Sequence, residues 1–246
     1  MVLEATNISK SYSKSRKRTV FQLQIEQFQI PKGSFTAILG PNGSGKTTFL
    51  KIILDLLFPD KGHIELMEKD HKLKESREQV GYLPENFSFP ESFTVRQVLE
   101  AFGSISTNRM QDVRDQITIL SGAFGVKYLD EKIKNLSKGM KQTSALMQTL
   151  LGNHKFYILD EPLNGLDAVQ KKTVMHYLLQ LKSQQNISLL ITTHILSDIE
   201  KLCDDIHLIK RGEIITSSSK LDILNEFGSV EDYYLNHFES ETFPDL

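Results

Sequence analysis

Residues 40–47 read Gly-Pro-Asn-Gly-Ser-Gly-Lys-Thr, and they constrain the fold of this chain more than any other segment. The apolar run 35–39 before them is typical of a strand, and the run 48–54 after them is typical of a helix. Glycines let backbone N–H groups converge on an anion, because no Cβ stands in the way. A strand, a glycine-rich loop and a helix in this order predict a phosphate-binding loop.

Two side chains at the end of this loop have the chemistry that a bound nucleotide requires. Lys46 is expected to reach the β- and γ-phosphates, and Thr47 to place its hydroxyl on Mg²⁺. The positive end of the helix that follows would point at the same anion. A plain glycine turn is the alternative interpretation, which the flanking strand and helix disfavour.

The composition is that of a folded protein and carries no global signal for nucleic acid. The 246 residues allow one or two domains, with 39 % hydrophobic and 24 % charged residues and a net charge of −2. One run within 11–19 is basic and holds no acid, with the cations Lys14, Arg16, Lys17 and Arg18. We interpret it as a solvated hairpin tip, with anionic lipid or nucleotide phosphate as alternative ligands.

Cys203 is the only cysteine, which excludes an intrachain disulfide and suits a reducing compartment. It lies in an amphipathic run, so we expect it to pack in the core. No apolar stretch approaches the ~18 residues that span a bilayer, and the N-terminus lacks a signal-peptide pattern. We therefore expect a cytoplasmic chain, and any membrane process that it serves needs another chain in the membrane.

The order of the expected elements indicates an α/β core that is interrupted by helices. Strands are expected at 1–8 and 21–25, with a turn over 11–19 between them, and at 35–39, 80–83, 156–160, 188–192, 206–209 and 213–216. Helical patterns fill 93–151 and return at 168–183, 219–227 and within 230–246. Thr94 and Gln97 form a capping box, and Ser137 is expected to cap a later helix. The alternation predicts a parallel sheet with crossover helices, all in one compact unit.

Two carboxylates, Asp160 and Glu161, end the apolar run that begins at Phe156. The last residues of a buried strand lie at the carboxyl edge of the sheet, where open α/β folds bind ligands. Asp160 is therefore placed to hold Mg²⁺ through water, and Glu161 to orient or deprotonate an attacking water. Beside the phosphate-binding loop, the pair resembles a Walker B motif.

Four further segments make the chain resemble the ABC-type ATPases. The segment 136–142, Leu-Ser-Lys-Gly-Met-Lys-Gln, resembles their LSGGQ signature. The segment 163–167, Leu-Asn-Gly-Leu-Asp, resembles the D-loop, and His194 resembles the switch histidine. The segment 80–85, Val-Gly-Tyr-Leu-Pro-Glu, occupies the place of the Q-loop. The order and spacing match over about residues 1–218.

This resemblance implies a P-loop NTPase core, with a mainly parallel sheet, an antiparallel N-terminal β part and an inserted α-helical subdomain. The core would cover about 1–85 and 155–218, the helical subdomain 86–154, and a C-terminal helical extension 219–246. The resemblance also implies ATP and Mg²⁺ as cofactors. Two such domains would pair head to tail around two ATP molecules, as a homodimer or with a similar ATPase subunit.

The resemblance also assigns roles to single residues. Ser137 and the N–H of Gly139 would contact the γ-phosphate held by the P-loop of the other subunit. Asp167 would bind across the same interface. His194 would donate to the γ-phosphate, and Tyr12 would stack on adenine.

The complete set of predicted site residues falls into three groups. Catalysis is assigned to Glu161, His194, Lys46 and Glu85. The metal is assigned to Thr47, Asp160 and Glu85. Nucleotide contact is assigned to Tyr12, Gly40, Pro41, Asn42, Gly43, Ser44, Gly45, Lys46, Thr47, Thr48, Ser137, Gly139 and Asp167.

The chain departs from the family pattern at a few positions. Glu85 replaces the usual glutamine of the Q-loop; its carboxylate can still ligate Mg²⁺ or hold water, but it adds negative charge. Lys138 and Met140 replace a glycine and the glutamine of the signature, while the residues that face the anion remain. Thr143 stands where a basic residue is usual, which weakens any assignment of anchoring contacts there.

Three aromatic residues, Phe87, Phe89 and Phe93, directly follow the Q-loop. In the family this region forms a groove that receives a short helix of the membrane subunit. The alternative is that they belong to the core of the helical subdomain, and we expect that at least one of them does.

The favoured hypothesis is the ATP-hydrolysing subunit of an ABC transporter, of the exporter type, on the inner face of the cell membrane. Nucleotide-driven dimerisation would power transport through separate integral membrane permease subunits, and no nucleic-acid partner is expected. The alternative is a soluble ABC-type ATPase that acts on ribosomes or DNA, although those usually carry two nucleotide domains or a long coiled-coil insertion. A P-loop kinase or GTPase is disfavoured, because the sequence has neither a phosphate-acceptor site nor a guanine-selective motif.

Overall fold

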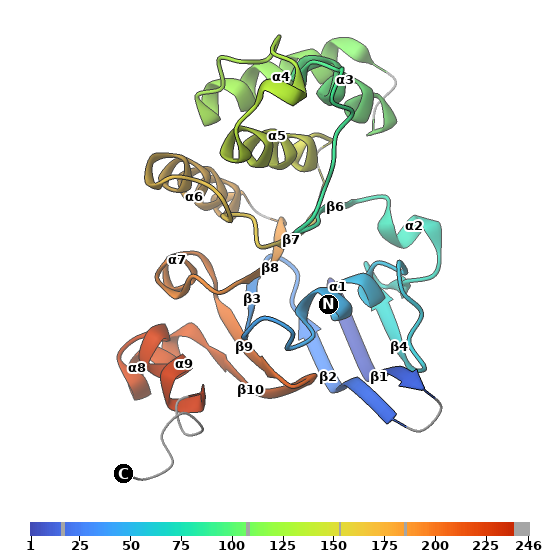
Figure 1. The fold of residues 1–246 in the computed structure, drawn as a ribbon. Helices are drawn as coiled ribbons and strands as arrows, with labels where there is room; N and C mark the ends of the chain where they lie inside the picture. Colours follow the sequence, from blue (N-terminus) through green and yellow to red (C-terminus); the bar gives the residue numbers. More distant parts are fainter. Residues whose placement is uncertain (16–17, 107–108, 153, 185, 239–246) are drawn as a thin grey trace. The chain divides into compact units, whose positions relative to one another are not determined.

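The computed structural model describes residues 1–15, 18–106, 109–152, 154–184 and 186–238, and these form two compact units (Figure 1). The first unit comprises Met1–Arg77 and Ser188–Leu246, and the second comprises Glu78–Ile187. The sequence predicted one compact unit, in which 80–83 and 156–160 were strands of the core. In the structure these two strands belong to the second unit, and the predicted domain boundaries remain a prediction.

The first unit contains a mixed sheet. Its strands are β1 (Leu3–Ser15), β2 (Arg18–Ile30), β3 (Phe35–Leu39), β4 (Lys61–Leu66), β5 (Lys69–Asp70), β8 (Ser188–Thr193), β9 (Asp205–Lys210) and β10 (Glu213–Ser219). They lie in the order β5-β4-β1-β2-β10-β9-β3-β8. β3 runs parallel to β8 and β9, whereas β1 pairs antiparallel with β2 and β4. This confirms the predicted fold class, with a parallel part and an antiparallel N-terminal part.

Two of the parallel strands of this unit, β3 and β8, are buried along their whole length. Every residue of β3 and of β8 is buried, which is typical of strands that helices cover on both faces. Helix α1 (Lys46–Ile53) buries Phe49, Leu50, Ile52 and Ile53 completely. The ring of Phe49 meets Phe28 of β2 edge-on, with 5.1 Å between the ring centroids, so the helix after the glycine-rich loop is fixed in the core.

The remaining helices of the first unit are α2 (Lys74–Arg77), α7 (Leu196–Leu202), α8 (Lys220–Phe227) and α9 (Val230–Phe238). Ser219 caps α8 and Gly228, at φ 82°, ends it, as the sequence predicts. Cys203 follows α7 and is fully buried, which confirms its interpretation as a core residue. No helix in the described part of the chain combines the length and apolar content that crossing a bilayer requires.

The second unit pairs two parallel strands, β6 (Val80–Leu83) and β7 (Phe156–Asp160), and is otherwise helical. Its helices are α3 (Val95–Ser106), α4 (Met110–Phe124), the 3₁₀ turn η1 (Ile133–Asn135), α5 (Lys138–Leu150) and α6 (Ala168–Ser183). The predicted capping box of α3 is present: Thr94 N donates to Gln97 Oε1 at 2.9 Å, and Gln97 N donates to Thr94 Oγ1 at 3.2 Å. Ser137 caps α5, also as predicted.

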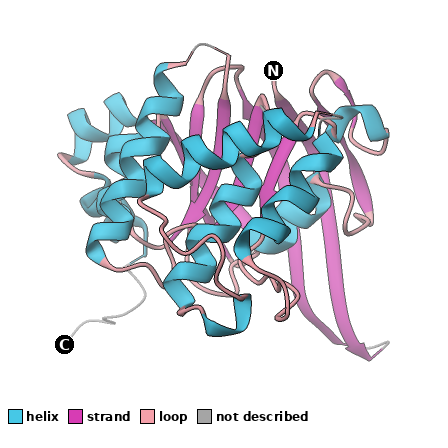
Figure 2. Cartoon of the chain, turned by 90° about the horizontal axis from the view of Figure 1, so that it is seen from above, coloured by secondary structure: helices cyan, strands magenta, loops and turns pink. Residues whose placement is uncertain are grey.

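The structure corrects the turn that was expected at 11–19. β1 continues to Ser15 and β2 begins at Arg18, so the first two strands form a long hairpin (Figure 2). The backbone pairing continues past Tyr12 and Phe21 to Ser15 and Arg18, which is beyond the apolar positions that the sequence pattern used. Of the basic run, residues 16–17 lie outside the described residues.

Three short elements, β4, β5 and α2, were not predicted. β4 buries only Ile64 and Leu66, and α2 spans four residues. Such short segments carry too few apolar positions for a periodic pattern. The helix expected at 48–54 begins earlier, at Lys46, because Gly45 in its left-handed conformation already ends the loop.

A buried histidine in the sheet of the first unit makes the stability of the fold depend on pH. His207 of β9 is 9 % exposed, and its ring lies 4.6 Å from that of Phe28. Its Nδ1 lies 2.6 Å from Ser217 Oγ, while Nε2 has no hydrogen-bond partner among the described residues. Burial lowers the pKa of His207 to about 4, and the charge of Asp205 opposes this only in part.

We therefore expect acid to destabilise this protein through His207. Between about pH 6.5 and pH 4 the unfolded chain binds a proton that the folded chain excludes, so stability falls as the pH falls through this window. From pH 7 to pH 5 the wild type should lose about 2 kcal/mol more unfolding free energy than a His207→Gln variant. Denaturant titrations of both proteins at the two pH values measure the difference, and equal losses would contradict the assignment.

Candidate functional site

The glycine-rich loop leaves the carboxyl end of β3 in a conformation that only its glycines allow. A Cβ on Gly40 would lie 2.2 Å from the carbonyl oxygen of Ile209, so no side chain fits there. Gly43 and Gly45 have φ angles of 79° and 113°, in the left-handed region that favours glycine. Ser44 N donates to Pro41 O at 3.2 Å and closes the turn. The glycine-rich loop, which includes Asn42, therefore joins a strand to a helix, as the sequence predicts.

The helix that this loop opens has an N-terminus suited to an anion. Gly45 is the N-cap of α1 and offers no side-chain cap, and the first turn of α1 holds no acidic residue. The N–H groups of Lys46, Thr47 and Thr48 therefore belong to a first turn that no side chain of the cap satisfies. Ser44 Oγ is buried without a hydrogen-bond partner among the described residues. An uncapped helix and an orphaned hydroxyl at one loop fit a phosphate group.

Lys46 supplies a buried cation at the same place. Its side chain is 7 % exposed, and Nζ donates to the carbonyl oxygens of Gly40 at 2.7 Å and Pro41 at 3.2 Å. Buried ammonium groups need such partners, since an unpaired charge is costly away from water. The carbonyls hold the amine at the loop, from which a phosphate oxygen can take over as its partner.

The sheet of the first unit brings His194 to the edge at which this loop begins. Leu39, the last residue of β3, pairs with Thr193, the last residue of β8. Gly40 and His194 therefore follow adjacent parallel strands at the same edge. His194 is exposed, and Ile195 N donates to Thr193 Oγ1 at 3.0 Å in the turn that holds it.

The sequence did not indicate Gly212, whose backbone forms a hydrogen bond to the glycine-rich loop. Gly212 N donates to Ser44 O at 2.8 Å, and Gly212 O accepts from Gln24 N at 2.7 Å. At φ 89°, a Cβ on Gly212 would lie 1.9 Å from Gln22 O. In the sequence, Arg211-Gly212 indicates a turn between two strands. Nothing in the sequence indicates that this turn contacts the glycine-rich loop.

Tyr12 lies on the hairpin strand β1, with its ring 40 % exposed. It pairs with Phe21, with 6.1 Å between the ring centroids. The ring of Phe21 in turn comes within 3.0 Å of the place that a Cβ on Gly45 would take. Tyr12 and Phe21 therefore lie on the face of the hairpin that packs on the glycine-rich loop. Stacking of adenine on Tyr12 requires that its ring is exposed, as it is in part.

In the second unit, three carboxylates lie at the carboxyl ends of the parallel strands β6 and β7, namely Glu85, Asp160 and Glu161. Leu83 pairs with Leu159, so Asp160, the last residue of β7, and Glu85, two residues after β6, lie at the carboxyl ends of parallel strands. Asp160 is fully buried and Glu161 is 6 % exposed, whereas Glu85 is exposed. Burial raises the pKa of the Tyr82 hydroxyl, and the charges of Asp160 and Glu85 raise it further.

Glu161 has an unusual backbone conformation. Its φ is 50°, in the left-handed region that non-glycine residues seldom adopt. Such strain persists only where the surrounding structure enforces it, and it occurs often at functional sites. Asn164 N donates to Glu161 O at 3.2 Å and holds this turn.

The signature segment packs tightly against the D-loop within the second unit. Ser137 Oγ accepts from Met140 N at 3.2 Å and caps α5. A Cβ on Gly139 would lie 2.6 Å from Gln170 Oε1 and 3.1 Å from the carbonyl oxygen of Gly165, so Gly139 packs closely on both. Gln142 Nε2 donates to Pro162 O at 3.0 Å, which joins α5 to the segment after β7.

The substituted positions of the signature have structural roles of their own. The stem of Lys138 lies over Gly165, where a Cβ would come within 2.9 Å of Lys138 Cε. The hydroxyl of Thr143 donates to Gly139 O at 3.0 Å, so its hydrogen bond lies within α5.

Asp167 of the D-loop is exposed and is the N-cap of α6. It forms a capping box with Gln170, whose backbone N–H donates to Asp167 Oδ1 at 2.8 Å.

The expectation that one of the three aromatics after the Q-loop lies in the core is wrong. Phe87 and Phe89 are half-buried, with 5.4 Å between their ring centroids, and Phe93 is 45 % exposed. Phe89 also meets Phe102, which is 41 % exposed. The three residues lie in a segment without helix, residues 84–94, and none of them is buried.

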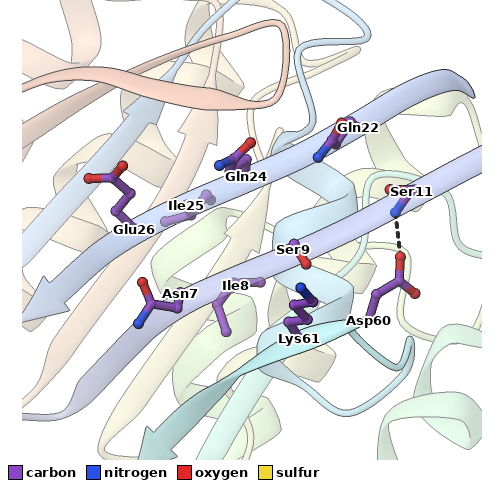
Figure 3. Close-up of a pocket in the computed structure, with 10 residues that line it drawn as sticks. All are labelled: Asn7, Ile8, Ser9, Ser11, Gln22, Gln24, Ile25, Glu26, Asp60 and Lys61. Atoms are coloured by element: carbon purple, nitrogen blue, oxygen red, sulfur yellow. Dashed lines mark hydrogen bonds between the residues drawn. The ribbon is translucent and has the colours of Figure 1, made fainter.

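The hairpin also carries a pocket of about 450 Å³, which contains none of the predicted site residues (Figure 3). Its lining residues are Asn7, Ile8, Ser9, Ser11, Gln22, Gln24, Ile25, Glu26, Asp60 and Lys61. Ser11 N donates to Asp60 Oδ2 at 2.7 Å at one end of it. Side chains alternate along a strand, so this polar face is the opposite face to that of Tyr12. We therefore place the candidate site at the glycine-rich loop and not in this pocket.

The predicted metal residues carry oxygen atoms, the ligand type that Mg²⁺ takes in proteins. No cluster of three or more His, Cys, Asp or Glu side chains suited to a metal occurs among the described residues. Mg²⁺ is usually held by one or two carboxylates together with substrate phosphates and water. Asp160 of the second unit is fully buried and ends a strand with a carboxylate, which is a ligand of this kind.

Comparison with known proteins agrees with the motifs. A family model described as "ABC transporter" matches residues 23–164. An uncharacterized ABC transporter ATP-binding protein of Synechocystis is 33 % identical over 228 residues, which cover 91 % of this chain. The chain spans 64 % of the length of that relative.

Two solved structures have the same fold over nearly the whole chain. The structure of an ATP-binding subunit of an ABC transporter has a TM-score of 0.82 at 25 % identity and covers 96 % of this chain and 99 % of its own. The structure of cbiO1 from Clostridium perfringens, part of the ABC transporter complex cbiONQ, has a TM-score of 0.75 at 25 % identity. It covers 97 % of this chain and 96 % of its own.

Gly212→Ala should destabilise the first unit more than the same change at another left-handed glycine. Gly33, at φ 79°, has nothing within 4 Å of an added Cβ, so Gly33→Ala costs only backbone strain of about 1–2 kcal/mol. Gly212→Ala adds a clash with Gln22 O, and we expect a loss of at least about 3 kcal/mol in unfolding free energy. Denaturant unfolding of both variants measures the difference, and equal losses would show that the close approach at Gly212 does not matter.

Proposed function

Because this chain belongs to the ABC transporter family, we propose that it is an ATPase subunit that binds ATP with Mg²⁺ and hydrolyses it. The observation that carries the proposal is the uncapped N-terminus of α1, with the buried Lys46 and the orphaned Ser44 hydroxyl beside it. Backbone N–H groups, a helix dipole and a cation all favour negative charge at this place. A triphosphate satisfies all three.

Nucleotide binding is divided among residues that contact the phosphates, the adenine or Mg²⁺. The loop 40–48 binds the phosphates, and Lys46 exchanges its carbonyl partners for β- and γ-phosphate oxygens. Tyr12 stacks on the adenine, which the exposure of its ring permits. Thr47 and Asp160 hold Mg²⁺, which neutralises phosphate charge when it is bound.

Hydrolysis depends on three further side chains. Glu161 accepts a proton from the attacking water or orients it, and the strained backbone of Glu161 supports a role for a fixed carboxylate. His194 donates a hydrogen bond to the γ-phosphate. Glu85, in place of the family's glutamine, ligates Mg²⁺ or holds the water.

The working form is a head-to-tail pair with a second copy or a similar ATPase subunit. Ser137 and Gly139 of one subunit contact the γ-phosphate bound by the other, and Asp167 connects the two sites. The exposure of Ser137 and Asp167 is compatible with contacts to another chain. The tight packing of Gly139 on Gln170 links the signature to the D-loop, so both would respond together.

Closure of this pair drives transport through integral membrane permease subunits at the inner face of the cell membrane. A solved relative at 25 % identity is part of an ABC transporter complex, which supports a role within a larger assembly. The exposed rings of Phe93 and Phe102 provide an apolar surface for such a partner.

Replacement of Glu161 tests the hydrolytic role. Glu161→Gln keeps the shape of the side chain but removes the base, so turnover should fall by about a hundredfold or more while ATP affinity is kept. ATP should also accumulate a dimer of this variant, because the closed form no longer reopens. Phosphate release, an ATP titration and size measurement with ATP provide the three readouts.

The matched control is Glu131→Gln, which neutralises an exposed carboxylate of the same unit outside the site. Its turnover should equal that of the wild type. Unchanged turnover in Glu161→Gln would remove Glu161 from this role.

A further inference from the structure

The C-terminal helix α9 is attached to the helix that follows His194. Residues 194 and 195 alone connect β8 to α7. Glu200 of α7 accepts the N–H of Val230, the first residue of α9, with Oε2 3.1 Å from the nitrogen. Val230 is fully buried, and α9 contacts both α7 and α8 (Figure 1).

A second anchor joins α9 to the sheet of the first unit. Tyr233 of α9 is 1 % exposed, and its hydroxyl lies 3.1 Å from Thr216 Oγ1 and 3.2 Å from Ser218 Oγ, both on β10. Its ring packs on Phe227 and His237, at centroid distances of 5.2 Å and 4.7 Å. α9 therefore bridges from a strand to α7.

Helix α7 needs such support because it is short. It has seven residues, and isolated helices of this length are unstable in water. Ile199 and Leu202 are fully buried and hold its apolar side. Glu200 adds a charged acceptor for a first-turn N–H of α9, which the helix itself leaves unsatisfied. This bond joins α7 to the first residue of α9.

We propose that Glu200 is a positioning residue for His194. The bond between Glu200 and Val230 attaches α7 to α9. Residues 194 and 195 connect α7 directly to β8, so the position of α7 determines the position of the His194 imidazole at the edge where the glycine-rich loop begins. The C-terminal helix thereby sets the rate of ATP turnover and leaves ATP affinity unchanged. This inference rests on the proposed ATPase function, because His194 must act on the bound nucleotide.

Two variants of Glu200 separate positioning from general stability. Glu200→Ala removes the acceptor, whereas Glu200→Gln keeps an oxygen for the Val230 N–H. In the full-length chain we expect Glu200→Ala to lower kcat at least about threefold, with KM for ATP within about twofold of the wild type. Glu200→Gln should restore kcat. Glu231→Ala, which removes an exposed carboxylate from the first turn of α9, is the matched control and should behave as the wild type.

Several results would overturn the inference. Wild-type kcat in Glu200→Ala would do so, and so would a rise in KM without a fall in kcat. Failure of Glu200→Gln to restore kcat would show that the accepted hydrogen bond is not what matters.

Hydrogen exchange provides a readout that does not depend on activity. The amides of 194–198 should exchange faster in Glu200→Ala than in the wild type and Glu200→Gln, because α7 opens more often. Equal exchange in all three proteins would contradict the inference even if the protein hydrolysed no ATP. A wild type without ATPase activity, but with this exchange pattern, would refute the proposed function alone.

Discussion

The structure depends on one constraint, the close approach of backbone to backbone around the glycine-rich loop. Gly40 lies against the carbonyl of Ile209, and Gly212 lies against the carbonyl of Gln22 at distances that exclude a Cβ. The bond from Gly212 N to Ser44 O joins these contacts. Strands β2 and β9 therefore hold the backbone of the loop in place through these contacts.

Parallel strands explain how residues far apart in the chain come to the same edge. In the first unit, the register of β3 and β8 brings Gly40 and His194 together. In the second unit, the register of β6 and β7 does the same for Glu85 and Asp160. Each unit thus presents its own polar groups at the carboxyl ends of its strands, as open α/β folds do.

The sequence predicted the elements in which the spacing of apolar residues and the capping or turn residues indicate the same structure. The strand 35–39, the helix 168–183 and the caps Ser137 and Ser219 were predicted because periodicity and capping residues are local signals. The hairpin extends further than predicted, and β4, β5 and α2 were missed, because cross-strand pairing and tertiary packing decide such segments. Gly212 and Glu200 were not found at all, since their contacts join segments far apart in the chain.

We propose that the N-terminus of α1 binds a triphosphate. Calorimetric titration of the wild type with ATP and with AMP, both in the presence of Mg²⁺, tests it most directly. If the phosphates carry the binding, ATP should bind at least about a hundredfold more tightly than AMP, since each charge-assisted bond contributes about 1.5–3 kcal/mol. Equal affinities would show that the β- and γ-phosphates contribute nothing, and would contradict triphosphate binding at this helix.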